Sequence, residues 1–133
     1  MEHPEYIPGV CNIGPAEIAM RRRTGWIGLA LTVVLGGVLA SLGAAAIWFS
    51  LLFIPSAISA VGFIQAKMHF CAAFGMRGLF NFGPEVGKTD TALQAEFRAR
   101  DKKKAMQILV YSALVGIAVA FAACLLRQIS SHP

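Results

Sequence analysis

Four side chains with soft donor atoms lie on either side of the first long apolar stretch: Cys11, Met68, His69 and Cys71. Thiolate and thioether groups suit copper(I), and histidine with cysteine suits zinc. The spacing is unfavourable, because His69 and Cys71 would point about 200° apart on a helix. Met68 and Cys71 would share a helix face, but two ligands are too few for a closed site. We therefore predict no metal site and no cofactor, and keep the four residues as candidates only.

Thiol chemistry is a second use for the cysteines. Cys11 and Cys71 both lie near predicted membrane segments on the predicted cytoplasmic side, where thiols stay reduced and acylation of a cysteine is possible. The three cysteines, with Cys124, are an odd number at unrelated spacings, which is not a disulfide framework. The remaining alternative is that each cysteine is a small, partly buried apolar residue.

The sequence GPEVGKT, residues 83 to 89, resembles a phosphate-binding P-loop but does not match it. The P-loop pattern requires a glycine five positions before Gly87, and that position is Phe82. We read the stretch as a turn, followed by a helix that starts near Thr91 with Thr91 and Gln94 as a capping box. The chain also shows no Ser-His-Asp set and no paired carboxylates, so we expect a non-catalytic protein.

The composition indicates a membrane protein. Of the 133 residues, 56% are hydrophobic and 14% are charged, whereas soluble domains carry about 25% charged residues. The mean hydropathy is +0.62. Residues 1–20 contain acidic residues and prolines and lack the apolar core of a signal peptide.

Two uncharged stretches predict three membrane-spanning helices in an all-α fold. Residues 26–66 would form a helix of roughly 60 Å, twice the thickness of the hydrocarbon core, so this stretch must fold back as a hairpin. We place the turn at residues 41–45, where Gly43 can take a positive φ, and expect Pro55 to kink the second helix. Residues 105–126 form the third span.

The lysines and arginines set the predicted orientation. All except Arg127 precede the first span or lie between the second and third spans. The positive-inside rule therefore places residues 1–25 and 67–104 in the cytoplasm, the tip of the 26–66 hairpin outside, and residues 127–133 outside. Nucleic-acid binding is disfavoured, because the basic residues flank apolar spans.

Two basic clusters are expected to anchor the spans and to contact anionic lipid headgroups. They are Arg21, Arg22 and Arg23, and Lys102, Lys103 and Lys104. A short surface helix is expected before the first span, with Gly14 as N-cap, Pro15 at the first position and Glu17 in the first turn. It would enter the bilayer near Gly25 and Trp26.

Small residues at four-residue spacing predict close helix packing, either within the chain or against a partner. They are Thr32, Gly36 and Ala40 in the first span, and Ser112, Gly116 and Ala120 in the third.

Between the spans, residues 65–83 contain four phenylalanines. Phe70 and Phe74 would share a helix face, so we expect an interfacial segment with its rings in the membrane or against a partner.

Two stretches resemble a group of small, poorly characterised bacterial inner-membrane proteins. They are CNIGPAEIAMRRR and GFIQAKMHFCAAFGMRGLFNFG. The resemblance implies a bacterial inner membrane and no activity. The sequence thus favours an accessory or assembly subunit of a larger membrane complex, or a homo-oligomer. The alternatives are a thiol- or metal-dependent carrier or sensor using Cys11 and Cys71, and a lipid-binding or membrane-shaping protein.

Overall fold

A computed structural model describes residues 6–131 of the chain. Helices account for 74% of these residues, which confirms the all-α class. The elements are α1 (Pro15–Ser41), the 3₁₀ helix η1 (Ala46–Leu52), α2 (Phe53–Met68), α3 (Ala72–Arg77), β1 (Leu79–Phe80), β2 (Asp90–Thr91) and α4 (Ala95–Ser131). The two strands form one short antiparallel pair, with Leu79 opposite Thr91 and Phe80 opposite Asp90.

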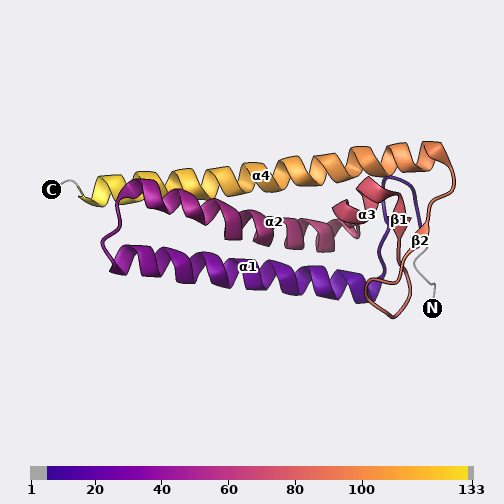
Figure 1. Ribbon diagram of the computed structural model, residues 1–133, viewed down its shortest axis with the longest axis horizontal. Coiled ribbons are helices and arrows are strands. Elements are labelled where there is room, and N and C mark those ends of the chain that lie inside the picture. Colours follow the sequence, from indigo (N-terminus) through magenta and orange to yellow (C-terminus); the bar gives the residue numbers. More distant parts are fainter. Residues whose placement is uncertain (1–5, 132–133) are drawn as a thin grey trace.

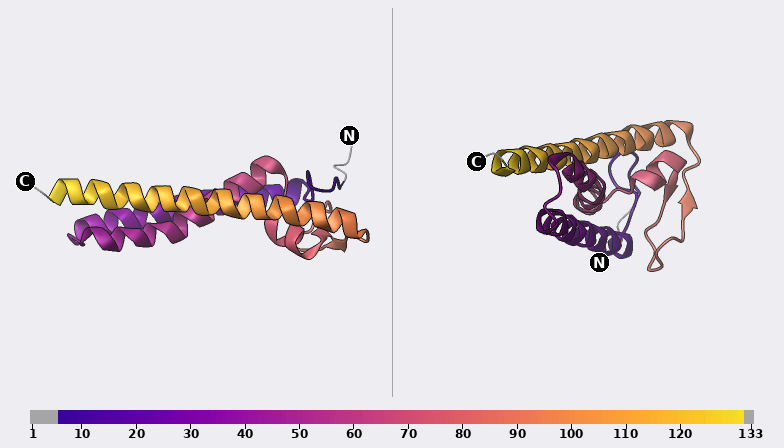
Figure 2. Two further views of the ribbon diagram at one scale, coloured as in Figure 1. Left: turned by 90° about the horizontal axis from the view of Figure 1, so that it is seen from above. Right: turned by 60° about the vertical axis from the view of Figure 1, so that its left-hand side comes forward.

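Three helical segments are long and apolar enough to cross a membrane, which indicates a multi-pass membrane protein. They are α1 with 27 residues, η1 and α2 together with 23 residues, and α4 with 37 residues. The segment of η1 and α2 lies between α1 and α4 and contacts both of them (Figures 1 and 2). The prediction of three spans is confirmed.

The connecting segments gather at one end of the helices. Residues 6–20 and 69–104, which we call the head, include α3, the strand pair and the first turns of α1 and α4 (Figure 1). The turn between α1 and η1 and the last turns of α4 lie at the opposite end. The molecule therefore has an apolar part of three helical layers and one polar end.

Glycines bring α1 and α2 together. A Cβ atom on Gly28 would lie 2.6 Å from the backbone nitrogen of Ser59 and 2.9 Å from the carbonyl oxygen of Pro55. Gly25 and Gly62 meet in the same way one turn further along. The Ser59 hydroxyl donates a hydrogen bond of 2.8 Å to the carbonyl oxygen of Gly25. Small residues allow this approach, which is typical of helix pairs in lipid.

The hairpin turn has the predicted geometry, since Gly43 has a φ of +66°. The guanidinium Nε of Arg127, near the end of α4, donates a hydrogen bond of 3.0 Å to the carbonyl oxygen of Ala44. The expected kink at Pro55 is a change of helix type, because the 3₁₀ helix η1 ends at Leu52 and α2 begins at Phe53. Pro55 then lies in the first turn of α2, where a missing N–H is tolerated.

The ends of the helices differ from the sequence-based expectation. The short surface helix and the first span are one continuous helix, α1, which starts at Pro15 with Gly14 as its N-cap as predicted. The capping box at Thr91 is wrong, because Thr91 pairs with Leu79 in the strand ladder and α4 starts at Ala95. Helix α4 then runs through the basic cluster without a break.

Helix α4 packs through one stripe of residues. Its buried positions are Asp101, Ala105, Ile108, Ser112, Gly116 and Ala120. At Gly116 a Cβ atom would meet the Phe53 ring at 2.8 Å and the Ala57 methyl at 3.0 Å, so this glycine allows the close contact with α2. The small-residue stripe of α4 is therefore used within the chain.

Candidate functional site

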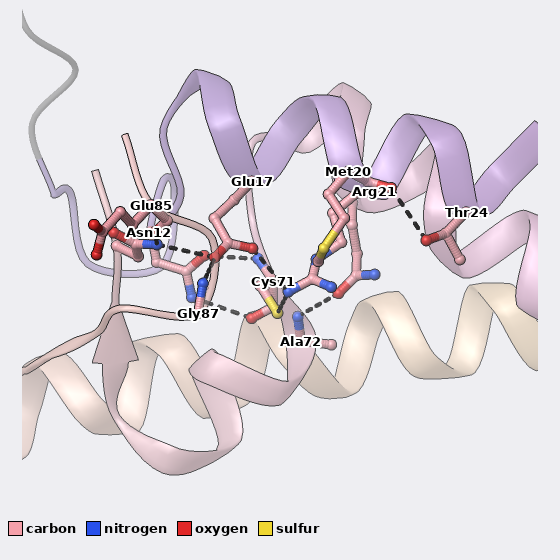
Figure 3. A network of polar contacts seen from close by, with 11 residues as sticks. Asn12, Glu17, Met20, Arg21, Thr24, Cys71, Ala72, Glu85 and Gly87 are labelled. Carbon is pink, nitrogen blue, oxygen red and sulfur yellow. Dashed lines mark hydrogen bonds and ion pairs between the residues drawn. The ribbon is translucent and has the colours of Figure 1, made fainter. Parts of the chain in front are cut away.

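The head contains a network of buried polar groups that joins segments far apart in the sequence (Figure 3). Asn12 binds both backbone groups of Cys71: its Nδ2 donates to the carbonyl oxygen at 3.1 Å, and its Oδ1 accepts from the amide at 2.6 Å. The backbone of Asn12 also bonds to His69 and Asn81. Through these bonds Asn12 holds the N-terminal segment beside the end of α2.

Glu17 is the centre of this network. Its side chain is 1% exposed. Its Oε1 accepts hydrogen bonds from Asn81 Nδ2 at 2.9 Å and from the amide of Gly87 at 2.6 Å, and its Oε2 accepts from Arg21 Nη2 at 3.3 Å. A buried carboxylate needs such compensation, because an unpaired buried charge is strongly destabilising.

The loop that resembles a P-loop contributes one amide to an anion of its own chain. The amide of Gly87 donates to Glu17, and Asn81 Nδ2 also donates to the carbonyl oxygen of Glu85 at 2.8 Å. Lys88, which would contact phosphate in a true P-loop, instead forms an exposed ion pair with Glu85 at 3.7 Å. The loop thus bonds to Glu17 through Gly87, and its lysine is paired with its own Glu85.

Arg21 points into the head. Its Nη2 lies 3.1 Å from Cys71 Sγ as well as 3.3 Å from Glu17 Oε2, and its guanidinium carbon lies 5.6 Å from the centre of the Phe74 ring. Its side chain is mostly buried. Within the predicted Arg21–Arg23 cluster, only Arg22 and Arg23 are exposed. Arg21 therefore bonds to groups of the polar network, and its expected headgroup contact stays a prediction.

Asp101 is the second buried carboxylate of the head and ties the N-terminal segment to α4. It is fully buried and accepts hydrogen bonds from the Tyr6 hydroxyl and from the amide of Gly9, the latter at 2.7 Å. The Tyr6 ring stacks on Phe80 with centroids 4.5 Å apart. Burial, then the hydrogen bond to Asp101 and its negative charge, raise the pKa of the Tyr6 phenol well above its usual value.

The aromatic segment packs inside the head. Phe70 is fully buried against Ala72, Ala105 and Ile108. The prediction that Phe70 and Phe74 share one helix face is wrong, because α2 ends at Met68 and α3 starts at Ala72. His69 takes the left-handed conformation between them, with a φ of 55°. Most of the ring surface is thus used within the chain.

The candidate metal ligands do not converge. Met68 packs against the Phe70 cluster, His69 is exposed, and Cys71 is 1% exposed beside Arg21. Cys11 is half-buried, and burial raises the pKa of its thiol. Among residues 6–131, no three His, Cys, Asp or Glu side chains are grouped as metal ligands.

The remaining predicted site residues divide between the helices. Thr32 and Gly36 are half-buried on α1, and Ala40 is exposed and lines a groove of about 330 Å³ between α1 and the end of α4. Ser112, Gly116 and Ala120 are buried on α4. Lys102 and Lys103 are exposed, and Lys104 is half-buried.

No protein-family model matches the chain, and no curated protein sequence or solved structure is significantly similar to it. The residues of the head therefore have to be interpreted from their geometry. That geometry uses Asn12, Glu17, Asn81 and Asp101 to hold loops together. Sequence reasoning missed Asn12, Asn81 and Asp101. For Glu17 it predicted only a favourable interaction with the helix dipole. The available signal for such residues was their position, because they are polar residues inside otherwise apolar or glycine-rich stretches.

Proposed function

We propose that the chain is a non-catalytic accessory or assembly subunit of a larger complex in a bacterial inner membrane. The observation that carries this proposal is the low burial of the three candidate spans. In their most apolar windows, 17% of the residues of α1, 33% of those of η1 and α2, and 22% of those of α4 are buried within the chain. Most of the apolar surface therefore faces other membrane components.

The polar head supports the same proposal. Its two buried carboxylates, Glu17 and Asp101, accept hydrogen bonds from side chains and backbone amides of the head. Groups held in this way stabilise a fixed shape and are not presented to a substrate. By the positive-inside rule, the basic head belongs in the cytoplasm, with the α1–η1 turn and the C-terminal end of α4 outside.

The proposed contact for a partner helix is the outer face of α1. Gly37 and Ser41 lie four residues apart on this face and are both exposed, and no atom lies within 4 Å of a Cβ placed on Gly37. Two small residues at this spacing let another helix approach closely in lipid. In the head, Leu93 is 87% exposed and Val86 is 50% exposed, which adds apolar surface for the same partner outside the membrane.

The test is purification of the tagged full chain from its native membrane in mild detergent, with mass spectrometry of the associated proteins. We expect a stoichiometric set of larger membrane subunits. A Gly37→Leu variant should lose them, because its side chain fills the open face and its Cβ has no other atom of the chain packed against it. The control is Ala118→Leu, which places the same side chain at an exposed position of α4.

Two results would overturn the proposal. One is a chain that is monomeric and free of partners in several mild detergents. The other is a catalytic activity in that isolated chain. If differently tagged copies of this chain co-purified with each other and with no other protein, the chain would form a homo-oligomer and would not belong to a larger complex.

A further inference from the structure

A basic groove lies between the N-terminal segment and α4. It has a volume of about 310 Å³ and is lined by Pro8, Gly9, Arg100, Lys103, Lys104 and Gln107. The four α4 residues have the spacing i, i+3, i+4 and i+7, which places them on one face of the helix. We propose that this groove binds the phosphate of an anionic phospholipid headgroup.

The far wall of the groove is a fixed part of the structure. Gly9 has a φ of +72°, and a Cβ atom there would lie 3.2 Å from the Cβ of Arg100, so the backbone of the segment lies directly against α4. The amide of Gly9 donates to the buried carboxylate of Asp101. Asp101, the single acidic residue between Arg100 and Gln107, is thus buried and hydrogen-bonded, and it is not among the residues that line the groove.

The charge in the groove is positive. Arg100 pairs with Glu96 at 2.7 Å, so its charge is partly compensated. In the described part of the chain no carboxylate oxygen lies within 4.0 Å of Lys103 or Lys104. Lys104 is half-buried against the segment, whereas Lys103 is exposed. Two lysines that have no acidic partner among residues 6–131, at the edge of one groove, favour a phosphate group.

The height of the groove on α4 fits a lipid headgroup. The uncharged stretch that predicts the third span begins at Ala105, between Lys104 and Gln107. At 1.5 Å per residue, the interval from Arg100 to Gln107 covers about 10 Å. The headgroup layer on each side of a bilayer is about 5 to 8 Å thick. A phosphate in the groove would therefore have its acyl chains beside the apolar part of α4.

The neighbouring lysine provides an internal control. Lys102 carries the same charge on the same helix, but it points about 100° away from Lys103 around the axis and does not line the groove. A general attraction between basic residues and an anionic surface would involve Lys102 equally. A specific site would depend on Lys103 and Lys104.

The test is native mass spectrometry of the full chain in neutral detergent, titrated with phosphatidylglycerol, with phosphatidylcholine or with inorganic phosphate. We expect tighter binding of phosphatidylglycerol than of phosphatidylcholine. The double variant Lys103→Ala/Lys104→Ala should weaken phosphatidylglycerol binding by about 25-fold, at about 5-fold for each lysine. Lys102→Ala should leave the affinity unchanged, and Lys103→Arg/Lys104→Arg should retain binding and thereby show that the charge is required.

Three results would overturn the proposal. They are equal affinity of the wild type for the two lipids, an equal loss in Lys102→Ala and in the double alanine variant, and inorganic phosphate that competes at the same concentration as the lipid. The last result would identify a free phosphate as the ligand. Thermal melting of each variant without added lipid shows whether it is folded, so a loss of binding is separated from a loss of structure.

Discussion

Substitution of Gly28 should open the contact between α1 and α2. In Gly28→Ala, the new methyl group would lie 2.6 to 2.9 Å from backbone atoms of Ser59 and Pro55, whereas ordinary contacts are 3.4 to 4 Å. Backbone atoms cannot turn aside, so the helices must separate by about 1 Å. Overpacking of this kind costs about 1 to 3 kcal/mol, and loss of the bond from Ser59 to Gly25 costs about 0.6 kcal/mol more. We expect a net loss of about 2 kcal/mol after the better helix propensity of alanine is subtracted.

The matched control is Gly37→Ala on the same helix, where no atom lies within 4 Å of the new methyl group. This variant should be as stable as the wild type or slightly more stable. The assay is reversible unfolding of the purified chain in mixed micelles with increasing denaturing detergent, followed by circular dichroism. If Gly28→Ala and Gly37→Ala unfolded at the same detergent fraction, the close approach of α1 and α2 would not be a determinant of stability and the reasoning would be refuted.

Four further outcomes test the head. Glu17→Ala should destabilise it by about 3 to 5 kcal/mol, because a buried charge loses its partner. The control Glu85→Ala removes an exposed ion pair and should change the melting temperature little. Equal effects of the two substitutions would contradict the buried network. Cys71, at 1% exposed, should react with a water-soluble maleimide only under denaturing conditions; labelling of the folded chain at Cys71 would disprove its burial. Cys11 should react slowly at neutral pH and faster as pH rises, because burial raises its pKa and lowers the thiolate fraction. The Tyr6 phenol has a higher pKa in the folded chain than in the unfolded chain. Its hydrogen bond therefore stabilises the fold below pH 10, and this contribution is lost as the pH rises further. Melting curves should show the loss in the wild type and not in Tyr6→Phe.

The apolar part of the fold was predictable because its signal is local. In a bilayer, the backbone N–H and C=O groups of an uncharged stretch of sufficient length must form their hydrogen bonds within the segment, and a helix achieves this. The turn at Gly43 and the helix start at Gly14 and Pro15 follow from equally local preferences for backbone geometry. The positions of all three spans needed no knowledge of tertiary contacts.

The head was not predictable in the same way, because its determinants are distant pairs. Glu17 is bound by Asn81 and by the amide of Gly87, more than sixty residues further along the chain. Arg21 has the same charge as its neighbours Arg22 and Arg23, but it points inward, where it contacts Glu17, Cys71 and Phe74. The spacing of four residues between Glu17 and Arg21 was visible and consistent with an ion pair, but its burial was not.

The long helix α4 is synthesised after α1, α2 and α3, and it completes contacts at both ends of the molecule. Asp101 binds the segment at Tyr6 and Gly9, and Arg127 binds the turn at Ala44. At about 5 to 20 residues per second, the ribosome needs about 2 to 7 seconds to add its 37 residues. Ala105 and Ile108 are the eleventh and fourteenth residues of α4, so the hairpin of α1 and α2 lacks their cover for Phe70 only early in that interval. The contacts of Asp101 and Arg127 therefore form only after the hairpin of α1 and α2 has been made, and a truncation upstream of α4 would remove both of them.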